Sequence, residues 1–176
     1  PMFLASQENK VEAMQWLFDH GAEDDVRTPL NDGTTPMYVT SENKHMEAMQ
    51  WLFDHGAQDD VRTPMNDGIT PMWIASQNNH VEAMQWLYDH GAQEDVRTPD
   101  NELTTPMYVS CEGGHLRAVQ FLHENGAAQD VNEKSWREET PLWRACKKNS
   151  LDIVQWLILQ GTPSKTTVAS WFNQLN

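Results

Sequence analysis

The fold is decided by TPMYVTSENKHMEAMQWLFDHGAQ, residues 35–58, which predicts two short helices. The leading Thr hydroxyl can accept a hydrogen bond from an unpaired first-turn amide, and Pro36 loses no hydrogen bond at the first helical position. A first helix is therefore expected to run to about Asn43. After a turn at Lys44, apolar residues recur at helical spacing as far as Gly56, whose backbone can adopt the left-handed conformation that ends a helix.

This stretch recurs along the chain at a step of 35 residues. The step is kept by Pro1, Pro36, Pro71, Pro106 and Pro141, by Gly21, Gly56, Gly91, Gly126 and Gly161, and by Trp16, Trp51, Trp86, Phe121 and Trp156. Between residues 36–70 and 71–105, 23 of 35 positions are identical. The sequence therefore predicts a single domain of five repeats at 1–35, 36–70, 71–105, 106–140 and 141–161.

The end of each repeat is predicted to project as a finger. Residues 57–69 contain Pro64 and the pair Asp67-Gly68, which favour turns over helix. No single repeat has enough apolar surface for a core of its own, so its stability must come from stacking on the next repeat. Later repeats carry Leu103 and Glu138 in place of the turn glycine, which predicts a different turn in their fingers.

The stretch TPMYVTSENKHMEAMQWLFDHGAQ resembles the ankyrin repeat, which has a T-P-L-H-x-A start, a Gly-His turn, a leucine-rich second helix and a Gly-Ala end. The resemblance covers nearly the whole chain. It implies an all-α solenoid of helix-turn-helix units with short β-hairpin or loop fingers. It also implies that a partner binds along the concave face formed by the fingers and the first helices. The step of 35 residues exceeds the usual length of about 33, which implies longer fingers.

The two ends of the stack differ in sequence. After Gly161, Val168, Trp171, Phe172 and Leu175 fall at helical spacing, which predicts a capping helix at 162–176. No matching polar cap is found at Pro1. We therefore expect the stack to be open at that end, because further repeats precede it or because the chain is shortened.

The net charge is −14 and is unevenly distributed. Residues 1–131 carry 22 acidic against 6 basic side chains, whereas residues 132–176 carry 4 against 6. A strongly acidic surface repels nucleic acids and anionic membranes and favours a basic protein or peptide partner. The alternative is that the charge only keeps the protein soluble.

The two cysteines, Cys111 and Cys146, occupy equivalent positions in neighbouring repeats. Equivalent Cα atoms in packed helices lie about 10 Å apart, too far for a disulfide. We therefore expect free, buried thiols and an intracellular, reducing location, either cytoplasmic or nuclear. The chain is expected to be a monomer.

The candidate binding residues include an aromatic row on the first helices, formed by Phe3, Tyr38, Trp73, Tyr108 and Trp143. Trp and Tyr dominate binding hot spots, so the row could supply anchors for a partner. The alternative is that the rings pack on each other and on the finger bases. Four positions further along the helices, Glu42, Gln77, Glu112 and Lys147 vary in charge and are better candidates for specificity.

The finger segments repeat an alternation of Arg and acidic residues. Arg27, Arg62 and Arg97 lie beside Asp25, Asp60 and Asp95 and near Asp32, Asp67 and Glu102. The pattern predicts ion pairs between neighbouring fingers, each of small energy when exposed. The alternative is that acidic tips such as Asp67, with Arg62 and Arg97 nearby, contact a basic peptide.

The last two repeats are less regular. They contain Trp136 and Arg137 in a finger, and Arg144, Lys147 and Lys148 on the following helix. This basic region could bind an acidic segment, or it could shield the end of the stack.

Metal binding and catalysis are not expected. Two histidine rows, His20, His55 and His90 and then His45, His80 and His115, repeat at the stacking distance and cannot converge on one ion. No phosphate loop, Cys-x-x-Cys pair or nucleophile elbow is present, and repeated acids do not form one asymmetric pocket. We therefore expect no enzyme activity and no cofactor.

These observations favour a protein-interaction module that binds a partner on its concave aromatic and acidic face. A passive structural spacer is the alternative, because near-identical repeats offer little specificity. A third hypothesis is that the chain recruits substrates for a larger enzyme.

Overall fold

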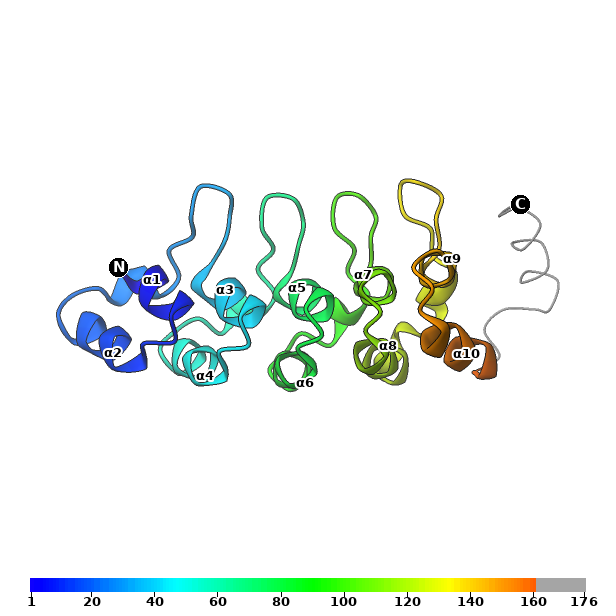
Figure 1. Cartoon of the computed structure of the whole chain (residues 1–176). Coiled ribbons are helices and arrows are strands. Elements are labelled where there is room, and N and C mark those ends of the chain that lie inside the picture. The colour runs from blue at the N-terminus through cyan, green and yellow to red at the C-terminus, as the bar shows by residue number, and fades with distance from the viewer. Residues whose placement is uncertain (161–176) are drawn as a thin grey trace.

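The computed structural model describes residues 1–160, which form a row of helix pairs (Figure 1). The predicted capping helix at 162–176 lies outside the described residues. The first helices of the five units are α1 (Met2–Gln7), α3 (Pro36–Glu42), α5 (Pro71–Gln77), α7 (Pro106–Gly113) and α9 (Pro141–Lys147). The second helices are α2 (Val11–Asp19), α4 (Met46–Asp54), α6 (Val81–Asp89), α8 (Leu116–Leu122) and α10 (Leu151–Leu159).

A short helical segment follows the second helix in each of the first four units. These segments are the 3-10 helices η1 (Glu23–Val26), η2 (Asp59–Val61) and η3 (Glu94–Val96), and then the π-helical turn η4 (His123–Ala127) with the 3-10 helix η5 (Ala128–Asn132). A finger then leads to the next first helix. In Figure 1 the fingers all project from the same side of the stack, next to the row of first helices.

The predicted helix starts are confirmed at four first helices. The hydroxyl of Thr35 accepts a hydrogen bond from the backbone amide of Tyr38 at 3.1 Å, and Pro36 is the first helical residue. The same cap recurs before α5, α7 and α9, at Thr70, Thr105 and Thr140. Each cap satisfies one amide that the helix itself leaves unpaired.

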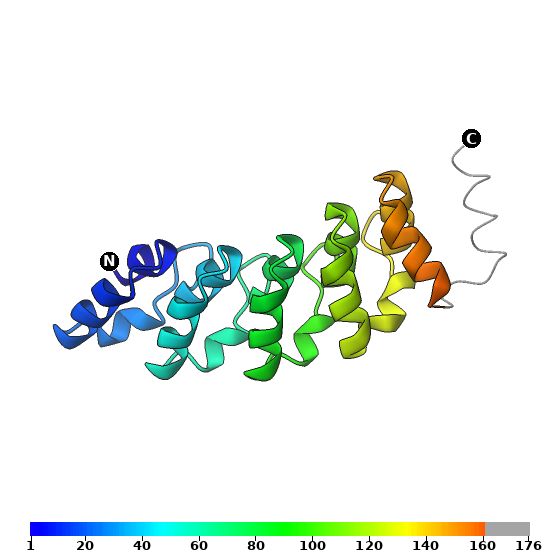
Figure 2. The same cartoon turned by 60° about the horizontal axis from the view of Figure 1, so that its bottom comes forward.

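The core is continuous from one unit to the next. Methionines fill it: Met2, Met14, Met37, Met49, Met72, Met84 and Met107 are all at most 1% exposed. Figure 2 shows the successive helix pairs side by side along one direction, so each unit packs mainly on its neighbours. Burial in this protein is therefore completed between units, as expected for a solenoid.

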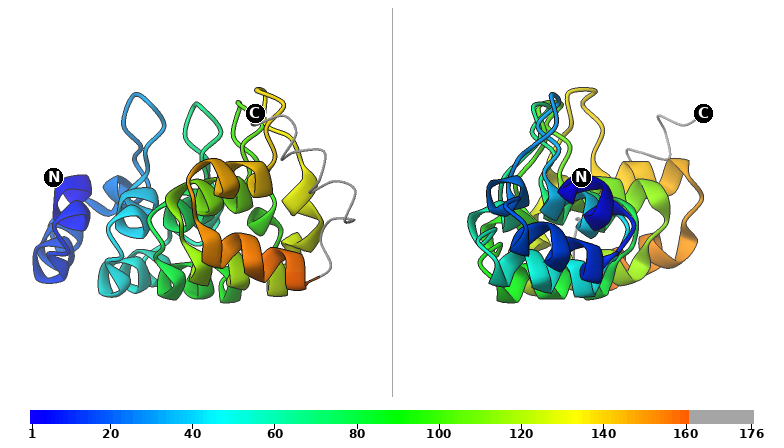
Figure 3. Two further views of the ribbon diagram at one scale, coloured as in Figure 1. Left: turned by 45° about the vertical axis from the view of Figure 1, so that its right-hand side comes forward. Right: turned by 90° about the vertical axis from the view of Figure 1, so that its left-hand side faces the viewer.

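The fingers are hydrogen-bonded loops, and no residue between 1 and 160 lies in a β-strand. Each loop closes on itself, as where the amide of Met65 donates to the carbonyl of Ile69 at 2.9 Å. Neighbouring fingers are also joined: the Asn66 amide donates to the Asp32 carbonyl at 2.9 Å, and the Asn101 amide to the Asp67 carbonyl at 2.8 Å. The end-on view in Figure 3 shows the fingers standing away from the helices, so the fingers and the first helices form two sides of one inner surface.

The expectation of a different turn in the later fingers is wrong. The backbone φ is +87° at Gly33 and +88° at Gly68, and it remains positive at Leu103 (+57°) and Glu138 (+61°). The shared hydrogen bonding between fingers imposes the left-handed conformation even where a side chain makes it unfavourable.

We expect Leu103→Gly to raise the free energy of unfolding by about 0.5 to 1 kcal/mol, because glycine removes the strain of the positive φ at some cost in unfolded-chain entropy. The Leu103 side chain is 57% exposed, so its loss removes little packing. Urea denaturation followed by circular dichroism measures the change. Leu30→Gly, at an exposed finger residue outside the positive-φ set, is the control and should not stabilise. Equal effects of the two substitutions would contradict the strain argument.

Candidate interaction surface

The aromatic row lies in the first turns of the first helices, but its central members are buried. Tyr38, Trp73 and Tyr108 are each 5% exposed, whereas Phe3 and Trp143 at the two ends are half-buried. The rings reach under the next finger. The Trp73 indole Nε1 donates to the carbonyl of Thr104 at 2.8 Å, and burial raises the pKa of the Tyr108 phenol, which donates to Glu139 Oε2 at 2.9 Å.

These contacts match the interpretation in which the rings pack on the finger bases. Tyr38, Trp73 and Tyr108 form one cluster with Ile74 and Val109. Little ring surface is left at the three central positions for a partner to contact. In an inner surface built on this row, the buried rings would therefore support more exposed side chains, and a partner would contact those side chains.

The polar positions at the ends of the first helices differ in how the chain itself uses them. Gln77 is exposed, and Glu42 and Glu112 are partly buried. Glu112 accepts a hydrogen bond from Nε of Arg144, one unit further along, at 3.1 Å. Lys147 is exposed and pairs with Glu139. Within residues 1–160, Gln77 and Glu42 are therefore the members of this set whose side chains are not engaged by the chain itself.

Arg62 and Arg97 hold neighbouring units together, which confirms the predicted ion-pair ladder. Nε of Arg62 lies 3.2 Å from Asp95 Oδ2, and Nε of Arg97 lies 2.8 Å from Asp130 Oδ1. Arg27 makes the equivalent pair with Asp60 at 2.9 Å. The three aspartates are at most 3% exposed. The ladder is thus partly buried and lies where the 3-10 segments lead into the fingers.

Asp67 lies at a fingertip and is exposed. Its carboxylate accepts a hydrogen bond from the Ile69 amide at 3.2 Å, which helps to shape the turn. The equivalent Asp32 accepts from the amide and the hydroxyl of Thr34, and these bonds lower the pKa of its carboxyl. The carboxylates of Asp32 and Asp67 therefore help to shape their turns and face solvent.

A hollow of about 230 Å³ lies between the first helices and the last two fingers. Its walls come from α5, α7 and α9 and from the fingers before α7 and α9. The structure brings together four residues that the sequence singled out as candidates, Trp73, Gln77, Tyr108 and Glu112. They are joined by Glu102, Trp136, Arg137 and Arg144.

The rim of this hollow is formed by residues that break the repeat. Trp136 is 53% exposed, and its indole Nε1 donates to Glu102 Oε2 at 2.9 Å. The Arg137 guanidinium lies 4.6 Å from the centre of the Trp136 ring. Arg144 is largely buried and bonds to Glu112 and Glu139. The hollow therefore presents an exposed ring and a cation beside acidic groups.

Glu139 is a residue of this region that the sequence analysis did not identify. It accepts hydrogen bonds from Tyr108, Arg144 and Lys147. The sequence does distinguish Glu139, because it is the only charged residue at its repeat position. The equivalent positions hold Thr34, Ile69 and Thr104. A break in a repeated row thus marks the site better than the row itself.

The family model for ankyrin repeats (three copies) matches residues 2–100 and 93–167. The chain belongs to the ankyrin repeat family. No curated protein gave a match to it. Ankyrin repeats generally act as protein-protein interaction modules and generally lack catalytic activity of their own. The inner hollow of this ankyrin stack lies between fingers and first helices.

Two further properties bear on what this ankyrin stack can do. Among residues 1–160, no group of three His, Cys, Asp or Glu side chains is arranged to hold a metal ion. No helix in the part of the chain that the structure describes combines the length and apolar character needed to cross a bilayer.

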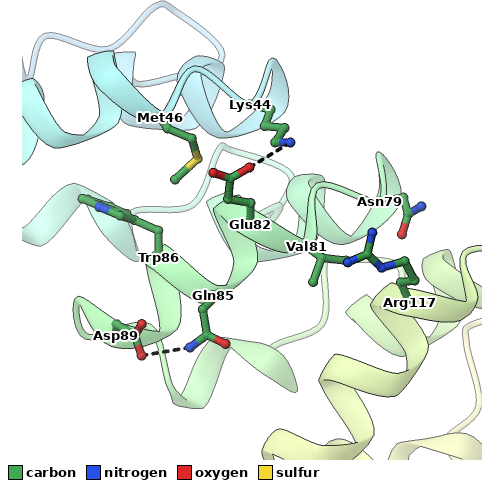
Figure 4. A pocket seen from close by; sticks show the side chains of 9 residues that line it. All are labelled: Lys44, Met46, Asn79, Val81, Glu82, Gln85, Trp86, Asp89 and Arg117. Carbon is green, nitrogen blue, oxygen red and sulfur yellow. Dashed lines mark hydrogen bonds and ion pairs between the residues drawn. The ribbon is translucent and has the colours of Figure 1, made fainter.

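A second, larger hollow of about 610 Å³ lies among the second helices of the ankyrin stack (Figure 4). Four of its polar side chains are engaged in pairs: Lys44 Nζ lies 2.9 Å from Glu82, and Gln85 donates to Asp89 at 3.0 Å. Arg117 enters from the neighbouring α8. Much of its lining belongs to the repeated pattern, so it is a weaker candidate for a specific partner.

Proposed function

We propose that this ankyrin stack binds a segment of a partner protein on the inner surface formed by its fingers and first helices, centred on the hollow beside Trp136. The observation that carries the proposal is the non-repeating rim of that hollow. Trp136 is half exposed although an apolar ring gains by burial, and large exposed rings are typical of binding surfaces. The buried row of Tyr38, Trp73 and Tyr108 supports this surface from beneath.

The proposal is tested by affinity capture with variants that leave the core intact. Trp136→Ala with Arg137→Ala removes the exposed rim, and Arg117→Ala on the second-helix side is the matched control for the loss of one Arg. We expect the rim variant to lose at least 80% or so of the captured partner, because truncation of hot-spot residues costs about 2 kcal/mol or more. Capture that is equal in the rim variant and in the control would refute the proposal.

A passive spacer is the second candidate. It is favoured by the ion pairs and backbone hydrogen bonds that join successive units, which would resist extension of the stack. A spacer needs no exposed rim, so capture independent of Trp136 and Arg137 would favour it. Recruitment of substrates to a larger enzyme uses the same inner surface and would be recognised by the identity of the captured proteins.

We further infer that the protein works as a monomer in a reducing compartment, the cytosol or nucleus. Both cysteines are free; Cys111 is buried, whereas Cys146 is only partly buried, contrary to the expectation for both. Burial raises the pKa of the Cys111 thiol, which makes it a poor nucleophile. Light scattering and imaging of the tagged protein test the two parts of this inference.

A further inference from the structure

The fingertips carry a line of charges that changes sign at its last member. The equivalent positions of four successive fingers hold Asp32, Asp67, Glu102 and Arg137. Backbone hydrogen bonds join each finger to the next, the last from the Trp136 amide to the Glu102 carbonyl at 3.0 Å. The four charged residues thus lie at equivalent positions of successive fingers, and these fingers stand in one row along the stack (Figure 1).

The neighbouring row at the ends of the first helices changes in the same direction. It holds Glu42, Gln77, Glu112 and Lys147. The adjacent position holds Val39, Ile74 and Val109 and then Arg144. Two further rows of the inner surface therefore become basic at α9, directly after the finger that carries Arg137, and there both cations are paired with Glu112 or Glu139.

The fingertip charges are not neutralised by the rest of the described chain. Among residues 1–160, no ion pair involves Asp32, Asp67 or Glu102, whose carboxylates accept from neutral groups. Arg137 likewise has no ion pair among these residues, and its guanidinium lies over the Trp136 ring. An uncompensated row of three negative charges and one positive charge therefore faces solvent, with an exposed aromatic ring at the point where the sign changes.

We propose that the partner segment is an extended peptide with basic side chains facing Asp32, Asp67 and Glu102 and an acidic side chain facing Arg137. The inference rests on the proposed function and names the chemistry of the partner. Equivalent positions of stacked units lie about 8 to 10 Å apart. A peptide in the extended polyproline II conformation advances about 3.1 Å per residue with three residues per turn, so every third side chain lies on the same face. The basic residues therefore recur about every third residue, and the acidic residue follows about three residues after the last of them.

Such a charge pattern does more for selection than for raw affinity. Complementary charges speed association, and a like charge at one position is repelled. An all-basic segment would meet the first three fingers well and would be repelled at Arg137. An apolar residue beside the acidic one would lie on the Trp136 ring.

The test uses two synthetic fluorescent peptides with three lysines at three-residue intervals. In one peptide the pattern ends with leucine and glutamate, and in the other a lysine replaces the glutamate. Both peptides are also made with the sequence reversed, because the row of fingertip charges does not define the direction in which a peptide would bind. Fluorescence anisotropy at low ionic strength gives each dissociation constant. For the favoured direction we expect the glutamate peptide to bind about fivefold more tightly than the lysine peptide.

A charge swap makes the test specific to Arg137. In Arg137→Glu the preference is expected to reverse, so that the lysine peptide binds more tightly. Arg117→Glu, which makes the same change on the second-helix side (Figure 4), should leave the preference unaltered. Circular dichroism confirms that both variants are folded.

An unchanged preference in Arg137→Glu would overturn the inference, as would failure of every peptide to bind. The proposed function is judged separately by the capture experiment. Rim-dependent capture of a partner without the charge pattern would leave that function standing while removing this inference.

Discussion

Trp73→Ala is expected to lower the free energy of unfolding by about 3 to 5 kcal/mol, the usual cost of truncating a buried Trp. The ring is 5% exposed and is packed with Tyr38, Ile74 and Tyr108 beneath the next finger. Its loss leaves a cavity, and it also leaves the Thr104 carbonyl without its indole donor. Urea denaturation followed by circular dichroism measures the effect.

Two further variants separate packing from hydrogen bonding. Trp73→Phe keeps one aromatic ring but removes the Nε1 donor together with part of the indole, so it should cost about 1 to 3 kcal/mol, less than the alanine substitution. Trp136→Ala removes a ring of the same type that is 53% exposed, and it should cost less than about 1 kcal/mol. A loss at Trp136 as large as that at Trp73 would mean that the finger is built differently from the structure described here.

Asp95→Ala is expected to lower the free energy of unfolding by about 2 kcal/mol. Its carboxylate is 3% exposed and accepts from Arg62 and from the Thr98 hydroxyl, and hydrogen bonds to charged groups contribute about 1.5 to 3 kcal/mol. The value stays below the 3 to 5 kcal/mol of a fully buried pair because the Arg62 side chain is 44% exposed and can be solvated.

The neighbouring Glu94 provides the control. Its carboxylate lies 3.0 Å from the same Arg62 guanidinium, slightly closer than that of Asp95, but its side chain is 82% exposed. Glu94→Ala should therefore cost less than about 0.5 kcal/mol. Thermal unfolding of both variants at low and high salt checks the comparison, and a larger loss for Glu94 would contradict the role of burial.

The Trp73 result bears directly on how function is tested. Alanine substitutions at Tyr38, Trp73 and Tyr108 would disturb the stack, so a loss of binding in such variants would not identify a binding surface. Trp136 and Arg137 are exposed and carry no comparable packing. They are the positions at which binding and stability can be measured separately.

The sequence alone determined the repeat, its helices and their caps. These features depend on residues close together in the chain, such as Thr35 and Pro36 before a helix or Gly56 after one. The same signals recur every 35 residues, which strengthens the prediction. The ankyrin family assignment follows from the same local pattern. The charge distribution, acidic in the first units and basic in the last, also follows from counting the charged residues in the sequence.

Tertiary structure decided the contacts between units. Arg62 lies beside Asp60 in the sequence but bonds to Asp95, 33 residues away, because stacking places the next 3-10 segment against it. The burial of Tyr38, Trp73 and Tyr108 depends in the same way on the finger of the following unit, which no local pattern specifies. Leu103 and Glu138 keep a left-handed turn because neighbouring fingers share hydrogen bonds, against their own preference. The energy of an interaction between units depends on which residues stacking brings together and on how deeply it buries them. Both are fixed only when the units pack, so the local sequence does not specify them.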